Sequence, residues 1–306
     1  MSSARRPGLW RLWLVWALLM LAATADARLG DRLRDRQDGA AAGSGPAPVT
    51  IAYGSDALQR LDVWQAGGRA GAAPLVLFVH GGAWKHGNKD NASSRWLPAH
   101  LTQQGYAYAS IDYRLVPAVT VEQQAEDVAR ALKALLDRAP EFGIDRERVV
   151  LMGHSAGAHL VALVGTDERY LQSAGLRFAD VVGVIANDGA AYDVPAQMQE
   201  DARLMHRTYA EVFGTDPARQ RALSPTAQAV APNVAAFLLL HVQRPDGVRQ
   251  ATALGHVLTA AGTTVERREF PGEGLRGHVA INRELGDPDY PATAVMDAWL
   301  RQRFGK

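Results

Sequence analysis

The fold of this chain is decided by the segment Val149-Val150-Leu151-Met152-Gly153-His154-Ser155-Ala156-Gly157-Ala158-His159-Leu160. An apolar run typical of a buried strand ends at Gly153, and a run with helical character begins after Ser155. Between them stands Gly-x-Ser-x-Gly, the pattern of a strand-to-helix elbow in which a serine adopts a strained backbone and exposes its hydroxyl. Small residues at the flanking positions let the strand and the helix approach closely. The segment therefore predicts a nucleophilic serine, Ser155, facing the N–H groups at the start of a helix.

Strand-like and helix-like periods alternate on both sides of this segment. The predicted strands are 49–53, 61–65, 75–80, 106–112, 148–152, 181–187, 237–242 and 265–270, and the predicted helices include 92–104, 121–138, 198–212 and 291–303. The first two strands are expected to form a hairpin, and the run 75–80 is apolar throughout, as in a strand covered on both faces. The alternation predicts an α/β fold with a mostly parallel central sheet and helices on both faces.

One connection is longer than the others. Residues 188–233 separate two predicted strands and contain a helix-like run and two Pro-containing turns. A connection of this length often covers a functional site, and we interpret it as a cap-like insertion. An ordinary crossover helix with long loops is the alternative.

The N-terminus has the composition of an export signal. A basic start is followed by the apolar run 12–23, which is shorter than a bilayer span, and residues 25–27 offer an Ala-x-Ala cleavage site. We predict a signal peptide at 1–27, a flexible linker at 28–48 and a catalytic domain at 49–306. The mature protein would be periplasmic or secreted, with no membrane contact. The alternative is that the uncleaved segment anchors it.

Composition excludes several classes of function. The formal net charge is +1, which gives no electrostatic case for nucleic acid as a partner. The chain contains no cysteine, so disulfides, thiolate catalysis and cysteine-based metal sites are excluded.

A nucleophilic serine needs a base, and the sequence favours His278. This residue lies in a glycine-rich loop after the last predicted strand. The other eight histidines fit better in a helix, a strand, the elbow itself or the loop after a buried strand: His80, His86, His100, His154, His159, His206, His241 and His256. Of these, we expect His80 to hold its loop by hydrogen bonds and His159 to pack in the core.

The base needs a carboxylate to orient it, and two aspartates that each follow a predicted strand between Ser155 and His278 are candidates. Asp246 follows the strand 237–242 between Pro and Gly, and we predict a loop residue that reaches His278. Asp188 follows the preceding strand and is the alternative. It could instead line the pocket or hold the insertion.

The oxyanion donors are predicted in His80-Gly81-Gly82-Ala83-Trp84. Two glycines directly after a buried strand let the backbone turn with its N–H groups directed into a site. We therefore assign the oxyanion hole to Gly81, Gly82 and Ala83, together with Ala156 from the elbow. Trp84 could form a wall of the acyl pocket or simply pack.

Taken together, these pieces resemble the α/β-hydrolase superfamily over residues 49–304. The resemblance is strongest to the esterases related to hormone-sensitive lipase, the feruloyl esterases and kynurenine formamidase. It rests on the oxyanion segment, the elbow and the segments Asp112-Tyr113-Arg114-Leu115, Arg244-Pro245-Asp246 and Gly277-His278. His154 stands where the hormone-sensitive-lipase group has aspartate, which favours the other two branches. The resemblance implies an α/β-hydrolase fold with no metal and no organic cofactor.

The sequence therefore predicts a carboxylic-ester hydrolase that acts on a small-molecule ester through an acyl-enzyme, with Ser155, His278 and Asp246 as the triad. Two alternatives remain. One is an amidase of the arylformamidase type, against which the export signal argues. The other is a catalytically inactive hydrolase fold that serves for binding.

Overall fold

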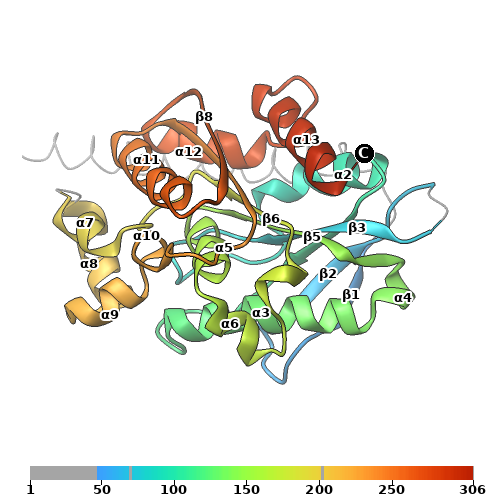
Figure 1. Ribbon diagram of the computed structural model, residues 1–306, viewed down its shortest axis with the longest axis horizontal. Helices are drawn as coiled ribbons and strands as arrows, with labels where there is room; N and C mark the ends of the chain where they lie inside the picture. Colours follow the sequence, from blue (N-terminus) through green and yellow to red (C-terminus); the bar gives the residue numbers. More distant parts are fainter. Residues whose placement is uncertain (1–46, 69–70, 201–202, 306) are drawn as a thin grey trace, which may run out of the picture. The chain divides into compact units, whose positions relative to one another are not determined.

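The computed structural model describes residues 47–68, 71–200 and 203–305 (Figure 1). The described residues form an eight-stranded sheet in the order β1-β2-β4-β3-β5-β6-β7-β8. The first two strands pair antiparallel with each other, β2 pairs antiparallel with β4, and all remaining pairs are parallel. The strands are β1 (Val49–Ala52), β2 (Arg60–Trp64), β3 (Ala73–Val79), β4 (Ala107–Ile111), β5 (Ile144–His154), β6 (Gly183–Asn187), β7 (Ala236–Gln243) and β8 (Thr264–Glu273).

Helices occupy most of the connections between these strands. They are η1 (Ala92–Arg95), α2 (Leu97–Gln103), α3 (Val121–Asp137), α4 (Ala139–Phe142), α5 (Ala156–Thr166), α6 (Glu168–Ser173), η2 (Phe178–Asp180), α7 (Val194–Gln199), α8 (Arg203–Phe213), α9 (Pro217–Ala222), α10 (Pro225–Gln228), α11 (Pro245–Ala260), α12 (Gly274–Arg283) and α13 (Pro291–Phe304). The predicted α/β fold with a mostly parallel sheet is confirmed.

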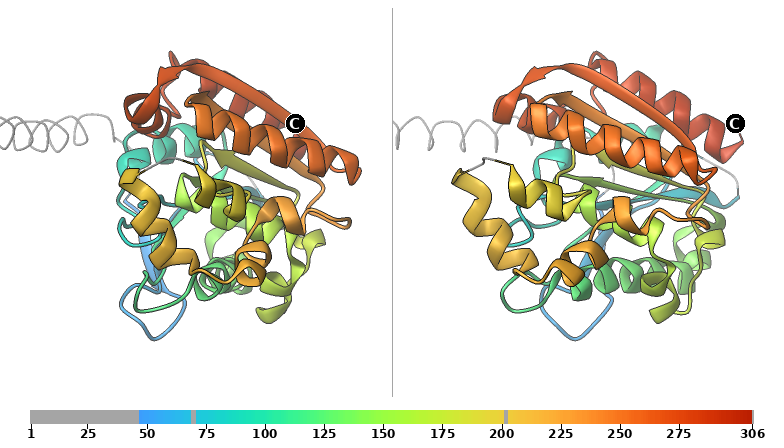
Figure 2. Two further views of the ribbon diagram at one scale, coloured as in Figure 1. Left: turned by 90° about the vertical axis from the view of Figure 1, so that its left-hand side faces the viewer. Right: turned by 60° about the vertical axis from the view of Figure 1, so that its left-hand side comes forward.

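The central strands are buried on both faces because successive side chains point to opposite sides of the sheet. In β3, Leu75, Leu77 and Val79 belong to one apolar cluster, and Val76 and Phe78 belong to the other. Helices α3 and α5 complete the first cluster, and α2 and α13 complete the second. Figures 1 and 2 show these two helical layers on either side of the sheet.

Two helical predictions differ from the structure. The predicted helix 92–104 is divided into η1 and α2, and the predicted helix 198–212 is replaced by α7 and α8. The first interruption follows local chemistry, since Pro98 stands in the first turn of α2, where a proline is tolerated. Several helices were not predicted, and among them α11 and α12 stand where the sequence suggested loops around Asp246 and His278.

The predicted signal peptide at 1–27 and nearly all of the predicted linker at 28–48 lie outside the described residues. In the part of the chain that is described, no helix is long and apolar enough to cross a bilayer.

Backbone packing at the end of β5 is close enough to require glycine at two positions. A Cβ on Gly157, in the first turn of α5, would overlap the carbonyl oxygen of Val79 in β3. A Cβ on Gly153 would overlap the carbonyl oxygen of Gly157. The flanking glycines of the Gly-x-Ser-x-Gly pattern therefore bring β3, β5 and α5 together around Ser155.

We expect Gly157→Ala to lower the free energy of unfolding by about 1–3 kcal/mol, because the added methyl overpacks a backbone contact. Gly255→Ala in α11 is the matched control, since its Cβ would lie 3.5 Å from Leu239 Cδ1, an ordinary contact. That control should be neutral or stabilising by up to about 1 kcal/mol, as alanine favours helices. Thermal unfolding of the two variants measures the difference, and equal stabilities would contradict the packing argument.

Candidate active site

Ser155 stands at the turn between β5 and α5 in a strained conformation. Its φ is 56° and its ψ is −117°, a backbone conformation that residues other than glycine rarely adopt. Although Ser155 occupies the N-cap position of α5, its side chain forms no capping hydrogen bond. The hydroxyl is thus directed away from the helix and toward His278, with 3.1 Å between Ser155 Oγ and His278 Nε2.

His278 lies between the serine and a carboxylate. Its Nδ1 is 2.5 Å from Asp188 Oδ2. A carboxylate can only accept a hydrogen bond, so Nδ1 carries the proton and Nε2 is left to accept the hydroxyl proton of Ser155. The sequence predicted that Ser155 and His278 would meet, and the structure brings them together.

Asp188 is the carboxylate that contacts His278. Its side chain is fully buried and its φ is 44°. Its Oδ1 accepts the N–H of Val242 at 3.3 Å, and the guanidinium of Arg244 lies beside Oδ2. Burial by itself would raise the pKa of Asp188, but the hydrogen bond from His278 and the charge of Arg244 lower it below its ordinary value. The carboxylate is therefore held ionised next to the imidazole.

The predicted contact between Asp246 and His278 is not formed. Asp246 lies in the first turn of α11 instead of a loop, and its carboxylate forms an ion pair with Arg244. The physical reason is local: Asp246 lies in the first turn of α11 and pairs with Arg244, and Asp188 directly after β6 contacts His278 instead. The alternative acid, Asp188, occupies the position that the sequence assigned to Asp246.

His278 is placed by a helix and not by a loop. It lies in the second turn of α12, which begins at Gly274. The chain before it bends sharply at Gly272, whose φ is 135°, and a Cβ there would come within 2.9 Å of Gly277 Cα. Glycines at both positions let the end of β8 fold back against α12 and turn the imidazole toward Ser155.

A second histidine fixes the backbone at His278. His154, the residue before the serine, has its Nε2 3.0 Å from the carbonyl oxygen of His278, and the two rings are 4.5 Å apart. Burial lowers the pKa of His154 to about 3, so the ring is neutral and donates from Nε2. The elbow and α12 are thus joined directly.

The predicted oxyanion segment lies against the serine. A Cβ on Gly81 would come within 2.9 Å of Ser155 Cβ, so the backbone passes Ser155 in van der Waals contact. Gly82, Ala83 and Trp84 all have positive φ, of 124°, 53° and 61°. Within the described ranges, no backbone hydrogen bond uses the N–H of Gly82 or Ala83.

Buried hydrogen bonds hold this strained segment in place. His80 donates from Nδ1 to the carbonyl oxygen of Gly81 and stacks on Tyr113, the holding role expected from the sequence. Trp84 is 1% exposed, and its Nε1–H lies 3.3 Å from Nδ1 of His159. His159 in turn donates to the carbonyl oxygen of Leu223. Trp84 therefore packs in the core. His159 packs there too, as the sequence predicted.

Residues with strained backbone conformations are concentrated around Ser155. Five non-glycine residues of the described chain have positive φ, and three of them are Ala83, Ser155 and Asp188. Such conformations cost on the order of 1–3 kcal/mol each and persist where the surrounding structure enforces them. Their concentration around one hydroxyl is typical of a catalytic site.

The insertion 188–233 packs against the oxyanion segment. The ring of Trp84 meets those of Tyr209 and Phe213 on α8 at 6.2 and 4.8 Å, and Lys85 forms an ion pair with Glu211 on the same helix. Figure 2 shows α7 and α8 beside the sheet. The insertion thus covers the loop next to Ser155, as expected of a cap.

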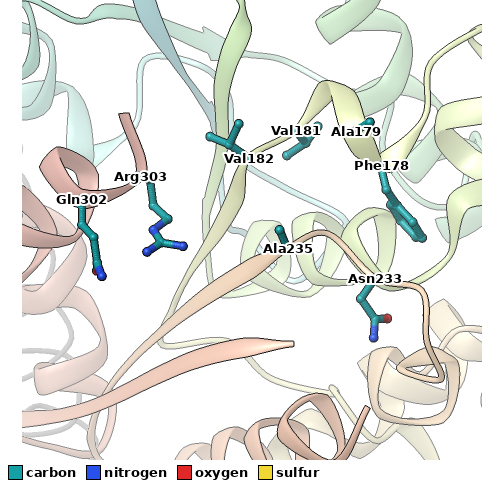
Figure 3. Close-up of a pocket in the computed structure, with 8 residues that line it drawn as sticks. All are labelled: Phe178, Ala179, Val181, Val182, Asn233, Ala235, Gln302 and Arg303. Atoms are coloured by element: carbon teal, nitrogen blue, oxygen red, sulfur yellow. The ribbon is translucent and has the colours of Figure 1, made fainter. Parts of the chain in front are cut away.

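One cavity of the described chain, of about 430 Å³, lies away from this site (Figure 3). Val182 and Ala235 in its wall precede β6 and β7, whereas Ser155 and Asp188 follow the carboxyl ends of β5 and β6. The cavity therefore lies at the amino ends of the parallel strands, and Ser155 lies at their carboxyl ends. No group of three or more His, Asp or Glu side chains within the described residues could hold a metal ion.

The sheet order and the elbow define an α/β-hydrolase. The chain belongs to the BD-FAE family, whose model matches residues 61–250. That range includes Ser155, Asp188 and Asp246 and ends before His278.

Individual relatives are esterases by name. A probable isoprenylcysteine alpha-carbonyl methylesterase from Oryza sativa subsp. japonica is 36% identical over 113 residues, which are 37% of this chain and 26% of that protein. Esterase LipC from Mycobacterium tuberculosis is 38% identical over 116 residues, which are 38% of this chain and 28% of that protein. The matched segment thus spans about a quarter of the length of these relatives. Among solved structures, Esterase B from Lactobacillus rhamnosis shares the fold, with a TM-score of 0.71, 23% identity and coverage of 94% of this chain and 95% of that one.

Exchange of Asp188 for Asn should lower kcat/KM on an ester by on the order of 10³–10⁴-fold, because an amide cannot hold the imidazole in the required tautomer. The same exchange at Asp246 should cost no more than about tenfold, since a partly exposed ion pair contributes little. Steady-state hydrolysis by the two variants decides between the carboxylates. A severe loss in Asp246→Asn with a mild one in Asp188→Asn would restore the assignment made from the sequence.

Proposed function

We propose that this chain is a serine carboxylic-ester hydrolase that acts through an acyl-enzyme. The observation that carries the proposal is the row of hydrogen bonds from Asp188 through His278 to Ser155, built from residues that follow β6, β8 and β5. A serine nucleophile, a base and an orienting carboxylate are the parts that acyl transfer requires.

In the first half-reaction, Ser155 Oγ attacks the ester carbonyl carbon while His278 Nε2 takes the hydroxyl proton. The tetrahedral intermediate then expels the alcohol, which leaves with the proton from Nε2, and an ester bond to Ser155 remains. The Asp188 carboxylate stabilises the imidazolium that exists between these two proton transfers.

In the second half-reaction, a water molecule takes the place of the alcohol. His278 Nε2 removes one proton from the water as the water oxygen attacks the acyl carbon. The proton is then delivered to Ser155 Oγ, and a carboxylic acid is released. The enzyme returns to its starting protonation state, so no co-reactant besides water is needed.

The negative oxygen of each tetrahedral intermediate would be stabilised by backbone N–H groups. Those of Gly82 and Ala83 come from a segment whose backbone lies against Ser155, and that of Ala156 begins helix α5. Such preorganised donors are worth about 3–4 kcal/mol each where they have been removed singly. The conformational strain of Ala83 is then the cost of directing its N–H into the site.

The proposed substrate is a small-molecule ester. The relatives named above are a methylesterase and an esterase, so the common chemistry of their names is hydrolysis of a carboxylic ester. No metal or organic cofactor takes part in the proposed mechanism, because every proton transfer is carried by His278.

We also propose that the protein is exported and that residues 1–27 are removed. The supporting observations are the basic start, the short apolar run and the Ala-x-Ala site in the sequence.

Purified protein lacking residues 1–27 should hydrolyse nitrophenyl acetate, butyrate or octanoate, and Ser155→Ala should reduce turnover by on the order of 10⁴-fold or more, because the nucleophile is absent. Release of nitrophenolate measures both, and the preferred chain length sizes the acyl pocket. Near-normal activity of Ser155→Ala would overturn the mechanism. Turnover of a formyl amide with none of the esters would favour the amidase, and no turnover of either would favour a binding role.

The chain of residues 1–306, expressed in a bacterium and recovered from the periplasm or medium, should begin at Arg28. Intact-mass measurement detects the loss of residues 1–27. Retention of the complete N-terminus in a membrane fraction would show an anchored protein instead.

A further inference from the structure

Arg244 contacts the same Asp188 carboxylate that accepts the hydrogen bond from His278, and Asp246 forms an ion pair with Arg244. Arg244 Nε is 3.4 Å from Asp188 Oδ2, the same oxygen that lies 2.5 Å from His278 Nδ1. On its other side, Arg244 Nη1 forms an ion pair with Asp246. One carboxylate oxygen is therefore shared between the imidazole and a guanidinium, and a second carboxylate offsets that guanidinium.

The guanidinium is fixed in this position. Arg244 Nη2 donates to the carbonyl oxygen of Gly189 at 2.9 Å, and its side chain is 15% exposed. A Cβ on Gly247 would come within 3.0 Å of Nη2, so the group is also packed against the start of α11. Asp246 is less buried, with 24% of its side chain exposed. These contacts hold the guanidinium of Arg244 beside Asp188.

We propose that the Arg244–Asp246 ion pair sets the proton affinity of His278 by acting through Asp188. Both are positioning residues for the triad and neither touches the substrate. A fixed cation beside the shared oxygen weakens the attraction between Asp188 and the imidazolium, so His278 remains an unprotonated base at lower pH. Asp246 limits this effect by partly cancelling the cation. The inference rests on the proposed function, because it concerns the base of that reaction.

The other titratable groups around the pair are neutral, exposed or paired with another residue: Glu200 pairs with Arg249, and Arg267 is exposed and contacts His241. Burial lowers the pKa of His154 and of His241 and raises the pKa of Tyr192, Tyr209 and Tyr290, so all five are neutral near pH 7. Glu273 and Arg276, beside His278 on its own segment, are exposed, and Glu284 pairs with Arg283. Among the described residues, Arg244 is the cation in contact with Asp188.

The proposal predicts opposite pH shifts from the two halves of the ion pair. Arg244→Gln removes the cation, so the imidazolium forms more readily and the acidic limb of log(kcat/KM) against pH should move to higher pH by on the order of one unit. Asp246→Asn removes the offsetting anion, so the limb should move to lower pH by about half a unit, because this carboxylate is partly exposed and screened.

Two variants separate charge from structure. Arg244→Lys keeps the cation but loses the guanidinium geometry, and its limb should stay within about 0.3 unit of the wild type. Asp137→Asn removes a carboxylate from the exposed ion pair with Lys133 on α3 and should leave the limb unmoved. A purely structural role of Arg244 would lower the plateau of kcat/KM in all Arg244 variants without moving the limb.

The experiment is the pH dependence of nitrophenyl ester hydrolysis by wild type and these variants at one ionic strength. Opposite shifts for Arg244→Gln and Asp246→Asn support the proposal, and unmoved limbs or shifts in the same direction overturn it. If Arg244→Gln does not fold, the sign of the Asp246→Asn shift alone decides. Absence of hydrolysis by the wild type would instead contradict the proposed function, so the two failures are distinguishable.

Discussion

The close backbone contact between β3, β5 and α5 is the constraint on which the site depends. Gly157 lies against the carbonyl oxygen of Val79, and Gly153 against that of Gly157. This contact forces Ser155 into its positive φ and presses the backbone of Gly81 against it. The proposed nucleophile and the proposed oxyanion donors are therefore positioned by a single packing interaction. The energy that maintains the strain comes from the two apolar clusters that bury the central strands.

The proposed proton path depends on the order of strands in a parallel sheet. The carboxyl ends of β5, β6, β7 and β8 lie side by side, so the residues that follow them meet at one edge. Ser155, Asp188, Arg244 and His278 each follow a different one of these strands. The residues Asp246, Arg244, Asp188, His278 and Ser155 form one continuous row of hydrogen bonds and ion pairs.

The insertion 188–233 is attached to the elements around Ser155 at several points. His159 on α5 links Trp84 of the oxyanion segment to the carbonyl oxygen of Leu223, and Trp84 packs on α8. Arg219 on α9 forms an ion pair with Glu122 on α3. A change in the insertion would therefore reach the oxyanion segment through packed rings. This arrangement connects the insertion with the segment that carries the proposed oxyanion donors.

The sequence by itself determined the parallel α/β sheet, the elbow at Ser155, the His-Gly-Gly segment and the choice of His278. Each of these depends on local patterns: a buried apolar run, small residues at fixed spacing, or a glycine-rich stretch after the last strand. Only the tertiary structure decided that Asp188, and not Asp246, meets the histidine, and that His278 lies in a helix. Both aspartates follow neighbouring strands and carry the same charge, so nothing local distinguishes them. The distinction arises in three dimensions, because Asp246 lies in the first turn of α11 and pairs with Arg244, and Asp188 contacts His278.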